Sequence, residues 1–407
     1  MNRRKLASIT LLNLGALSWF FVFNNFLEDI FQVLTPNVLN WGSYIGNSLF
    51  FGAIIFWSIT ISFIGNKINR RKLLFTSIIL GIFSTILLGL LEGTFFASIT
   101  SFLMGSSLGL GLPSSMSLVS DCTVFDNRGR ISGIILLSTF IVGFVFMLLT
   151  QILNPNIDTL GFTDVWGFIL LLVVLRSISL FGLIMEKCDN HPIALTKTRL
   201  KISTYKDFFV YLCIFLLFGI ASGLAWNLIP NKFQPQVDFG SSIRFILIAI
   251  FGVLAGILAD KFGRKQPIMV GLGALGIGFL MLGFDMSETS VIMYMILSGI
   301  TWGSFFVVFL AIPGDLSLPN SREKFYALGY ILPLFGQFIL ATIPAETLIS
   351  FGLTTNQIAI ILGVCLFLAI YPLQRSKETL TESKKQERKM KEHLEKVKKL
   401  VEEETDN

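Results

Sequence analysis

The sequence is poor in charged residues, which occupy only 14% of its 407 positions. A soluble globular domain carries roughly a quarter charged residues, so a water-soluble enzyme of this length is not expected. Hydrophobic residues make up 53% of the chain, and the sequence contains 40 phenylalanines. This composition is typical of an integral membrane protein.

Histidine and cysteine are also scarce, with 2 and 4 residues respectively. His191 and His393 both lie in polar stretches, which argues against a histidine-based metal site or catalytic base inside the membrane. Cys122 and Cys188 lie in polar loops and the other two in apolar stretches, so no disulfide framework is indicated. Nucleotide-binding fingerprints are absent as well. We therefore expect no enzyme, no metal, no cofactor and no nucleic-acid partner.

Long apolar stretches fill most of the chain. A helix needs about 20 predominantly apolar residues to cross the hydrocarbon core of a bilayer. We predict twelve spans, at residues 6–34, 43–64, 73–91, 94–119, 131–153, 165–185, 207–230, 241–259, 267–284, 289–312, 325–349 and 355–374. The first stretch is too long for a signal peptide and has no small-residue cleavage site after it. The predicted fold is an all-α polytopic membrane protein.

The distribution of basic residues predicts the orientation, because lysine and arginine remain on the cytoplasmic side. With the N-terminus inside, 29 of the 32 basic residues are cytoplasmic. The outer loops then hold nine acids and a single basic residue, Lys232. We expect a multi-pass protein of the plasma membrane with both termini in the cytoplasm. The remaining two arginines, Arg176 and Arg244, fall inside predicted spans.

The chain resembles itself at an offset of 194 residues, without gaps and mostly at loop positions. The matched pairs include Pro36/Pro230, Gly46/Gly240, Arg70/Arg264, Gly105/Gly299, Asp121/Asp315 and Arg128/Arg322. Two parallel six-helix halves, related by an axis along the membrane normal, are a transporter architecture. We predict an N-terminal half at residues 1–185, a cytoplasmic linker at 186–206, a C-terminal half at 207–375 and a charged tail at 376–407.

A motif rich in glycine and charge follows the eighth predicted span. Gly256, Asp260, Gly263, Arg264 and Lys265 form the pattern G-x-x-x-D-K-x-G-R-K. It resembles the G-x-x-x-D-R-x-G-R-K signature of the major facilitator superfamily. Glycine permits close helix packing, the acid can pair with an arginine, and a helix N-terminus favours a nearby negative charge.

The matching loop after the second span is a degraded copy, with Asn66 in place of the acid but with Arg70 retained. The loops at 121–130 and 315–324 also look like those of the superfamily, so the resemblance covers residues 1–375. It implies a twelve-helix transporter whose motif loops hold the two halves together on the cytoplasmic side in the outward-open state. Since the first copy lacks its acid, we expect this latch to depend on Asp260 more than on Asn66.

Polar residues inside the spans are candidates for a substrate pathway. Asn13, Asn24 and Glu28 fall on one face of the first helix, which indicates a cavity or a polar neighbour. Glu28 lies either at the outer end of this helix or on the cavity wall, and it is the best-placed carboxylate for proton coupling. Arg244 needs a partner, either an acid such as Glu28 or Asp158 or an anionic substrate.

Five further polar or aromatic residues inside the spans are candidates for the substrate pathway. The candidates are Gln151, Trp226, Asn227, Trp302 and Gln337, although each alone is more often a packing residue. Arg176 lies too near the middle of its predicted span for its side chain to reach the membrane surface easily. Because the sixth helix is peripheral in the family, a structural pair or a water-filled crevice is favoured over a functional role for this arginine.

We predict a monomeric secondary transporter that moves a small organic solute by alternating access, with protons as the candidate coupling ion. A uniporter would need no coupling carboxylate. The alternatives are a lipid flippase, which requires a lateral opening and a polar lining, and a membrane sensor that binds ligand without flux. The tail shows amphipathic helical spacing and balanced charge. A solvated helix is expected there, with a partner or self-association as the alternative, and its deletion should leave transport largely intact.

Overall fold

The structure is a computed structural model that describes residues 3–25, 45–64, 68–90, 93–123, 125–153, 165–185, 202–318, 321–341 and 352–379. Within these residues it is all helical. The first six long helices are α1 (Arg3–Asn25), α3 (Asn47–Ile64), α4 (Arg70–Leu90), α5 (Thr94–Cys122), α6 (Arg128–Leu153) and α7 (Val165–Met185). The later ones are α8 (Ile202–Leu228), α9 (Gln234–Lys261), α10 (Lys265–Phe284), α11 (Glu288–Leu316), α12 (Arg322–Tyr326), α13 (Leu332–Ala341), α15 (Thr355–Leu368) and α16 (Ile370–Arg375).

Twelve helical segments of the described residues are long and apolar enough to cross a membrane, and each overlaps one predicted span. The predicted fold class is therefore confirmed. The eleventh span consists of α12, the π-helical segment η7 (Ala327–Ile331) and α13. The eighth begins earlier than predicted, at Gln234, because a proline in the first helical turn needs no hydrogen-bond partner for its nitrogen. Helix α8 begins at Ile202, inside the predicted linker.

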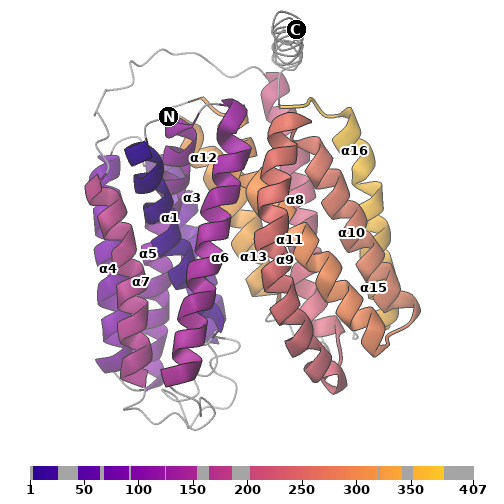
Figure 1. Cartoon of the computed structure of the whole chain (residues 1–407), viewed down its shortest axis with the longest axis horizontal. Coiled ribbons are helices and arrows are strands. Elements are labelled where there is room, and N and C mark those ends of the chain that lie inside the picture. The colour runs from indigo at the N-terminus through magenta and orange to yellow at the C-terminus, as the bar shows by residue number, and fades with distance from the viewer. Residues whose placement is uncertain are drawn as a thin grey trace, which may run out of the picture.

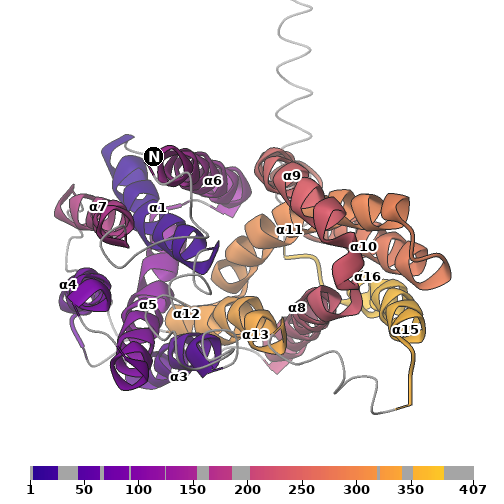
Figure 2. The same ribbon diagram turned by 90° about the horizontal axis from the view of Figure 1, so that it is seen from below.

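The helices gather into two groups, with α1 to α7 on one side and α8 to α11, α15 and α16 on the other, while α12 and α13 lie between the groups against α3 (Figures 1 and 2). The first described helix begins and the last one ends at the same end of the bundle (Figure 1). Seen along the helices, α6 lies beside α9 and α3 lies beside α13, so the two groups meet along two seams (Figure 2). These seams enclose the space in which the candidate site lies.

Helices α6 and α9 touch only over part of their length. A Cβ atom added at Gly256 would lie 2.5 Å from the carbonyl oxygen of Gly129, so glycine is required for this close approach. One to two turns along the helices, Gly133 faces the backbone of Gly252. Beyond this contact the helices separate. The bundle is therefore closed at one end of this seam and open further along it.

The second seam is closed by aromatic rings near the middle of the bundle. Phe51 of α3 stacks on Phe338 of α13 with ring centroids 4.8 Å apart, and Phe20 of α1 contacts Phe335 edge to face at 5.0 Å. All are apolar and lie in or against the main core. Such aromatic pairs contribute roughly 0.5–1.5 kcal/mol beyond burial of their area. They join the two halves, and Phe338 also lines the candidate cavity described below.

Candidate functional site

Arg244 of α9 lies between two tryptophans. Its guanidinium carbon is 5.3 Å from the ring centroid of Trp226 and 5.2 Å from that of Trp302, within the range of a cation–π interaction. Trp226 comes from α8 and Trp302 from α11, so three helices of the second half fix the guanidinium group. Among the described residues Arg244 forms no ion pair with a carboxylate.

A cavity of about 150 Å³ opens beside this arginine between the two halves. Five residues that the sequence nominates line it together: Asn24, Trp226, Arg244, Trp302 and Gln337. Phe21 and Phe140 from the first half complete the wall. Glu28 and the side chain of Gln151 lie outside the described residues, so their predicted roles stay predictions. The cavity is thus formed by both halves, with most of its polar groups on the second.

Several polar atoms of the cavity wall are buried without a hydrogen-bond partner. They are Nε of Arg244, Nε1 of Trp302, Oε1 of Gln337 and Oγ of Ser222. Leaving such a group unpaired costs roughly 1–3 kcal/mol, more for a charged one. A bound solute or water that pairs with them would remove this cost. The donors, a guanidinium and an indole N–H, suit an anionic oxygen.

Ser222 was not nominated from the sequence, although it lies four residues before Trp226 and therefore shares its helix face. Asn227, which was nominated, does not line the cavity. Its side-chain amide donates to the carbonyl oxygens of Leu340 and Ala341, at 3.4 and 3.2 Å, and so ties α8 to the end of α13. Its position indicates a packing role.

Arg176 of α7 is buried inside the first half, away from this cavity. Its guanidinium donates to the carbonyl oxygen of Ser77 at 3.3 Å and lies 5.6 Å from the ring centroid of Trp19. No ion pair joins it to a carboxylate of the described residues, and its Nε has no hydrogen-bond partner. The space beside it is only about 10 Å³, which is the size of a single water site.

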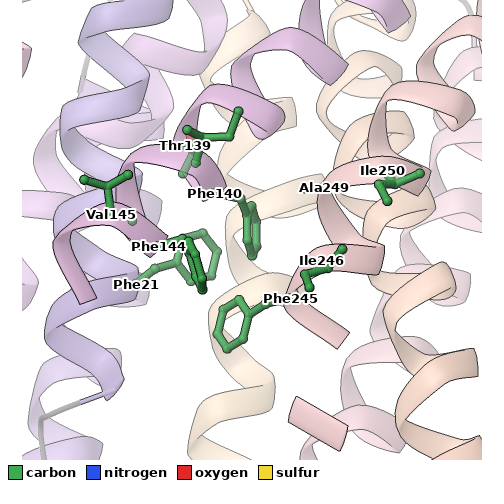
Figure 3. Close-up of a pocket in the computed structure, with 11 residues that line it drawn as sticks. Phe21, Thr139, Phe140, Phe144, Val145, Phe245, Ile246, Ala249 and Ile250 are labelled. Atoms are coloured by element: carbon green, nitrogen blue, oxygen red, sulfur yellow. The ribbon is translucent and has the colours of Figure 1, made fainter. Parts of the chain in front are cut away.

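An apolar cleft adjoins the polar cavity, where α6 and α9 separate. Its volume is about 260 Å³, and Phe140, Phe144, Phe245, Ile246 and Ile250 are among its lining residues. Figure 3 shows the phenylalanine rings between the two helices, with Ile246 and Ile250 along α9. Phe140 and Phe245, with ring centroids 5.8 Å apart, line both the cleft and the polar cavity.

At the other end of the seam the motif acid closes the bundle. The carboxylate of Asp260 accepts hydrogen bonds from the backbone N–H groups of Gly129 and Arg130, both at 2.9 Å. These two residues form the first turn of α6, where the helix dipole favours a negative charge. Asp260 has no exposed surface and also accepts from Arg264 at 2.6 Å. A carboxylate of the second half therefore caps a helix of the first half.

A second buried acid extends this contact. Asp315, at the end of α11, accepts from Arg264 at 2.9 Å and from Arg128 of the other half at 2.5 Å. Burial alone would lower the pKa of Arg264, but the charges of Asp315 and Asp260 outweigh burial and hold that pKa above its ordinary value. Arg264 therefore remains charged at any physiological pH.

The equivalent pairs of the first half are more exposed. Arg70 donates to Asp121 at 2.6 Å and to Glu323 of the other half at 3.1 Å. Arg322 of the second half also donates to Asp121. The side chain of Asp121 is 23% exposed, whereas that of Asp315 is fully buried. Arg128 and Arg322, which the 194-residue offset relates, thus each cross to the acid of the opposite half. We call these ion pairs, with the Asp260 contacts, the closed-end network.

The last described residues attach to the motif loop. Gly263 has φ +113°, a conformation that L side chains rarely adopt, and the carboxylate of Glu378 lies against it. Glu378 accepts from the backbone N–H of Arg264 at 2.8 Å, at the start of α10. Lys265 donates from Nζ to the carbonyl oxygen of Gln374 at 3.0 Å. The sequence did not indicate this contact. Asn66 of the first motif copy lies outside the described residues.

Comparison with known proteins agrees with this architecture. The sequence profile of the Major Facilitator Superfamily matches residues 208–402. A putative proline/betaine transporter of Staphylococcus aureus (strain COL) is 23% identical over 296 residues, which cover 63% of this chain and 61% of the relative. The chain therefore matches about three fifths of that protein's length.

Solved structures with the same fold cover nearly the whole chain. The transporter FucP in its outward conformation matches with a TM-score of 0.73 and 12% identity, over 93% of this chain and 99% of FucP. The proton:xylose symporter XylE matches with a TM-score of 0.66 and 13% identity, over 93% of this chain and 97% of XylE. The profile match over residues 208–402 and the shared fold thus show that the chain is similar to members of the Major Facilitator Superfamily.

Proposed function

We propose that this protein is a secondary transporter that moves a small organic solute bearing a carboxylate across the membrane by alternating access. The observation that carries the proposal is Arg244, held between two tryptophans in a cavity formed by both halves. A guanidinium group there attracts an anionic oxygen and orients it through paired N–H donors. The indole N–H of Trp302 and the amide of Gln337 supply further polar contacts.

The similar transporter from Staphylococcus aureus supports a substrate that carries a carboxylate. Proline and betaine, for which it is named, each carry a carboxylate as their only anionic group. In such a solute the carboxylate would pair with Arg244, while the tryptophan faces and the unpaired oxygens of Gln337 and Ser222 would contact the rest of the molecule.

Alternating access in this proposal uses the two seams. The closed-end network would hold the halves together while the cavity is accessible from the opposite side of the membrane. Breaking the ion pairs of this network would open the closed end. Since the basic residues concentrate at this end, we propose that it faces the cytoplasm together with both termini, in the plasma membrane. The units that move would be residues 1–185 and 207–375, within a monomer.

Flux measurements in proteoliposomes test the proposal. The purified protein is reconstituted, and uptake of labelled proline, betaine and small monocarboxylates is compared with and without an imposed pH gradient. Transport of at least one carboxylate is expected, with stimulation by the gradient if Glu28 couples protons. Ligand binding without any flux would favour the sensor, and translocation of a fluorescent phospholipid alone would favour the flippase.

A matched pair of variants tests whether Arg244 binds the substrate. Arg244→Gln removes the charge and should reduce transport at least tenfold, because truncating a buried charge partner costs roughly 2–5 kcal/mol. Asn227→Ala removes a polar side chain of the neighbouring helix that packs against α13, and should leave substrate affinity unchanged. Equal losses in the two variants would contradict the assignment of Arg244.

A further inference from the structure

The apolar cleft between α6 and α9 adjoins the polar cavity but has an almost wholly apolar lining. Its one polar side chain, Thr139, donates its hydroxyl hydrogen to the carbonyl oxygen of Ile135 in its own helix at 2.8 Å. The cleft therefore presents no unpaired side-chain group to a polar ligand. Filling the cleft lowers the free energy only for a hydrocarbon group, because its apolar surface is removed from water.

The cleft opens outward on the apolar surface of the bundle. Phe144 of α6 and Ile246 of α9 are 52% and 56% exposed, and both line it. In a membrane this surface faces the acyl chains of the bilayer. On its inner side the cleft reaches the polar cavity, because Phe21, Phe140 and Phe245 line both spaces. These three phenylalanine rings thus lie at the boundary between an apolar and a polar compartment.

We propose that the substrate is a single-chain anionic amphiphile, with its carboxylate at Arg244 and its hydrocarbon chain in the α6–α9 cleft. This inference rests on the proposed function and names its substrate class. The unpaired donors of the cavity require an anionic head, and the satisfied apolar wall of the cleft requires a tail. The two compartments, of about 150 and 260 Å³, together fall in the roughly 300–1,000 Å³ range of small-molecule pockets.

The position of the cleft also defines a route. An amphiphile dissolved in the bilayer would enter sideways between Phe144 and Ile246, head first toward Arg244, while its tail remained in apolar surroundings. Ile250 lies six residues from Arg244, which is roughly 9 Å along α9 at the helical rise. The cleft thus extends toward the closed end, and a tail lying in it would run alongside the two helices rather than across the cavity.

Chain-length dependence of binding tests the proposal. Binding of labelled butyrate, hexanoate, octanoate and decanoate is measured to the full-length protein in nanodiscs, against free aqueous concentration and with empty nanodiscs subtracted. Affinity should rise two- to fourfold with each added methylene until the cleft is filled, as expected for transfer of a methylene from water to an apolar site. Arg244→Gln should weaken binding of every member of the series.

A matched pair of glycine variants separates the cleft from the bilayer. Gly143 lines the cleft, and a Cβ atom added there meets nothing within 4 Å, so Gly143→Phe fills the cleft without disturbing the helix packing. Gly167 of α7 also has open space around an added Cβ but lies away from the cleft, which makes Gly167→Phe the control. Gly143→Leu provides a smaller filling group should the phenylalanine variant fail to fold.

The expected result is that Gly143→Phe abolishes the chain-length dependence and leaves butyrate binding intact, whereas Gly167→Phe retains the wild-type series. An affinity that does not change with chain length, but that still depends on Arg244, would contradict the proposal that the substrate is an amphiphile. The proposed function would not be affected by that result. A chain-length series unaffected by Gly143→Phe would place the tail in the bilayer and also overturn the proposal. Absence of carboxylate binding and flux altogether would refute the proposed function itself.

Discussion

Replacing Asp260 by asparagine changes the charge of the closed-end network with almost no change in size. The carboxylate has no exposed surface and accepts three hydrogen bonds, two from the first turn of α6 and one from Arg264. An asparagine retains one carbonyl oxygen, and its amide N–H₂ would face one of the two backbone N–H groups. Arg264 would keep Asp315 as its remaining acid.

The size of the effect follows from these contacts. A hydrogen bond to a charged group contributes roughly 1.5–3 kcal/mol, and a charge at a helix N-terminus roughly 0.3–2 kcal/mol. The variant loses one hydrogen bond to a backbone N–H, and the remaining hydrogen bonds no longer have a charged acceptor. These losses should destabilise the closed end by about 2–4 kcal/mol. Since 1.4 kcal/mol corresponds to tenfold, the ratio of closed to open molecules should fall roughly 30- to 1,000-fold.

A distance measurement across the closed end checks this value. Spin labels at Ile68 and Leu368, both exposed and on opposite halves, report the separation of the halves in nanodiscs. Asp260→Asn should populate longer distances. The control is Asp121→Asn, whose carboxylate is 23% exposed and should contribute about 1 kcal/mol or less. Unchanged distances in Asp260→Asn, or an equal shift in Asp121→Asn, would refute the reasoning.

Three other changes have definite expected outcomes. Arg176→Met should leave the thermal unfolding temperature unchanged or raise it, because no described carboxylate pairs with this arginine; a large decrease would contradict this. Gly263→Ala should destabilise the protein by roughly 1–2 kcal/mol in thermal unfolding, since its φ is +113°. Deleting residues 380–407 should preserve flux in proteoliposomes. Glu378→Gln should lower the thermal unfolding temperature because the carboxylate of Glu378 binds the motif loop; an unchanged unfolding temperature would contradict this role of Glu378.

The spans and the family motif could be predicted from the sequence because each depends on local composition. Arg244 was also predictable, since a charge inside an apolar span is costly and needs a partner. Ser222 and Phe140 were not, because serine and phenylalanine are common in membrane helices and only helix rotation brings these two to the cavity. The contact of Glu378 with Arg264 was missed for a different reason. It joins residues 114 positions apart, and a solvated charged tail gives no signal of where it will bind.

The closed-end network combines symmetry in its pairing with asymmetry in its burial. Arg128 and Arg322 cross between the halves in equivalent ways, yet Asp315 is fully buried and Asp121 partly exposed. The side containing Asp260 and Asp315 should therefore be the stronger, because exposed ion pairs contribute little. Opening would then begin on the Asp121 side, where the first motif copy has Asn66 instead of an acid. Asn66→Ala should consequently shift the label distances much less than Asp260→Asn, and equal shifts would contradict this order of opening.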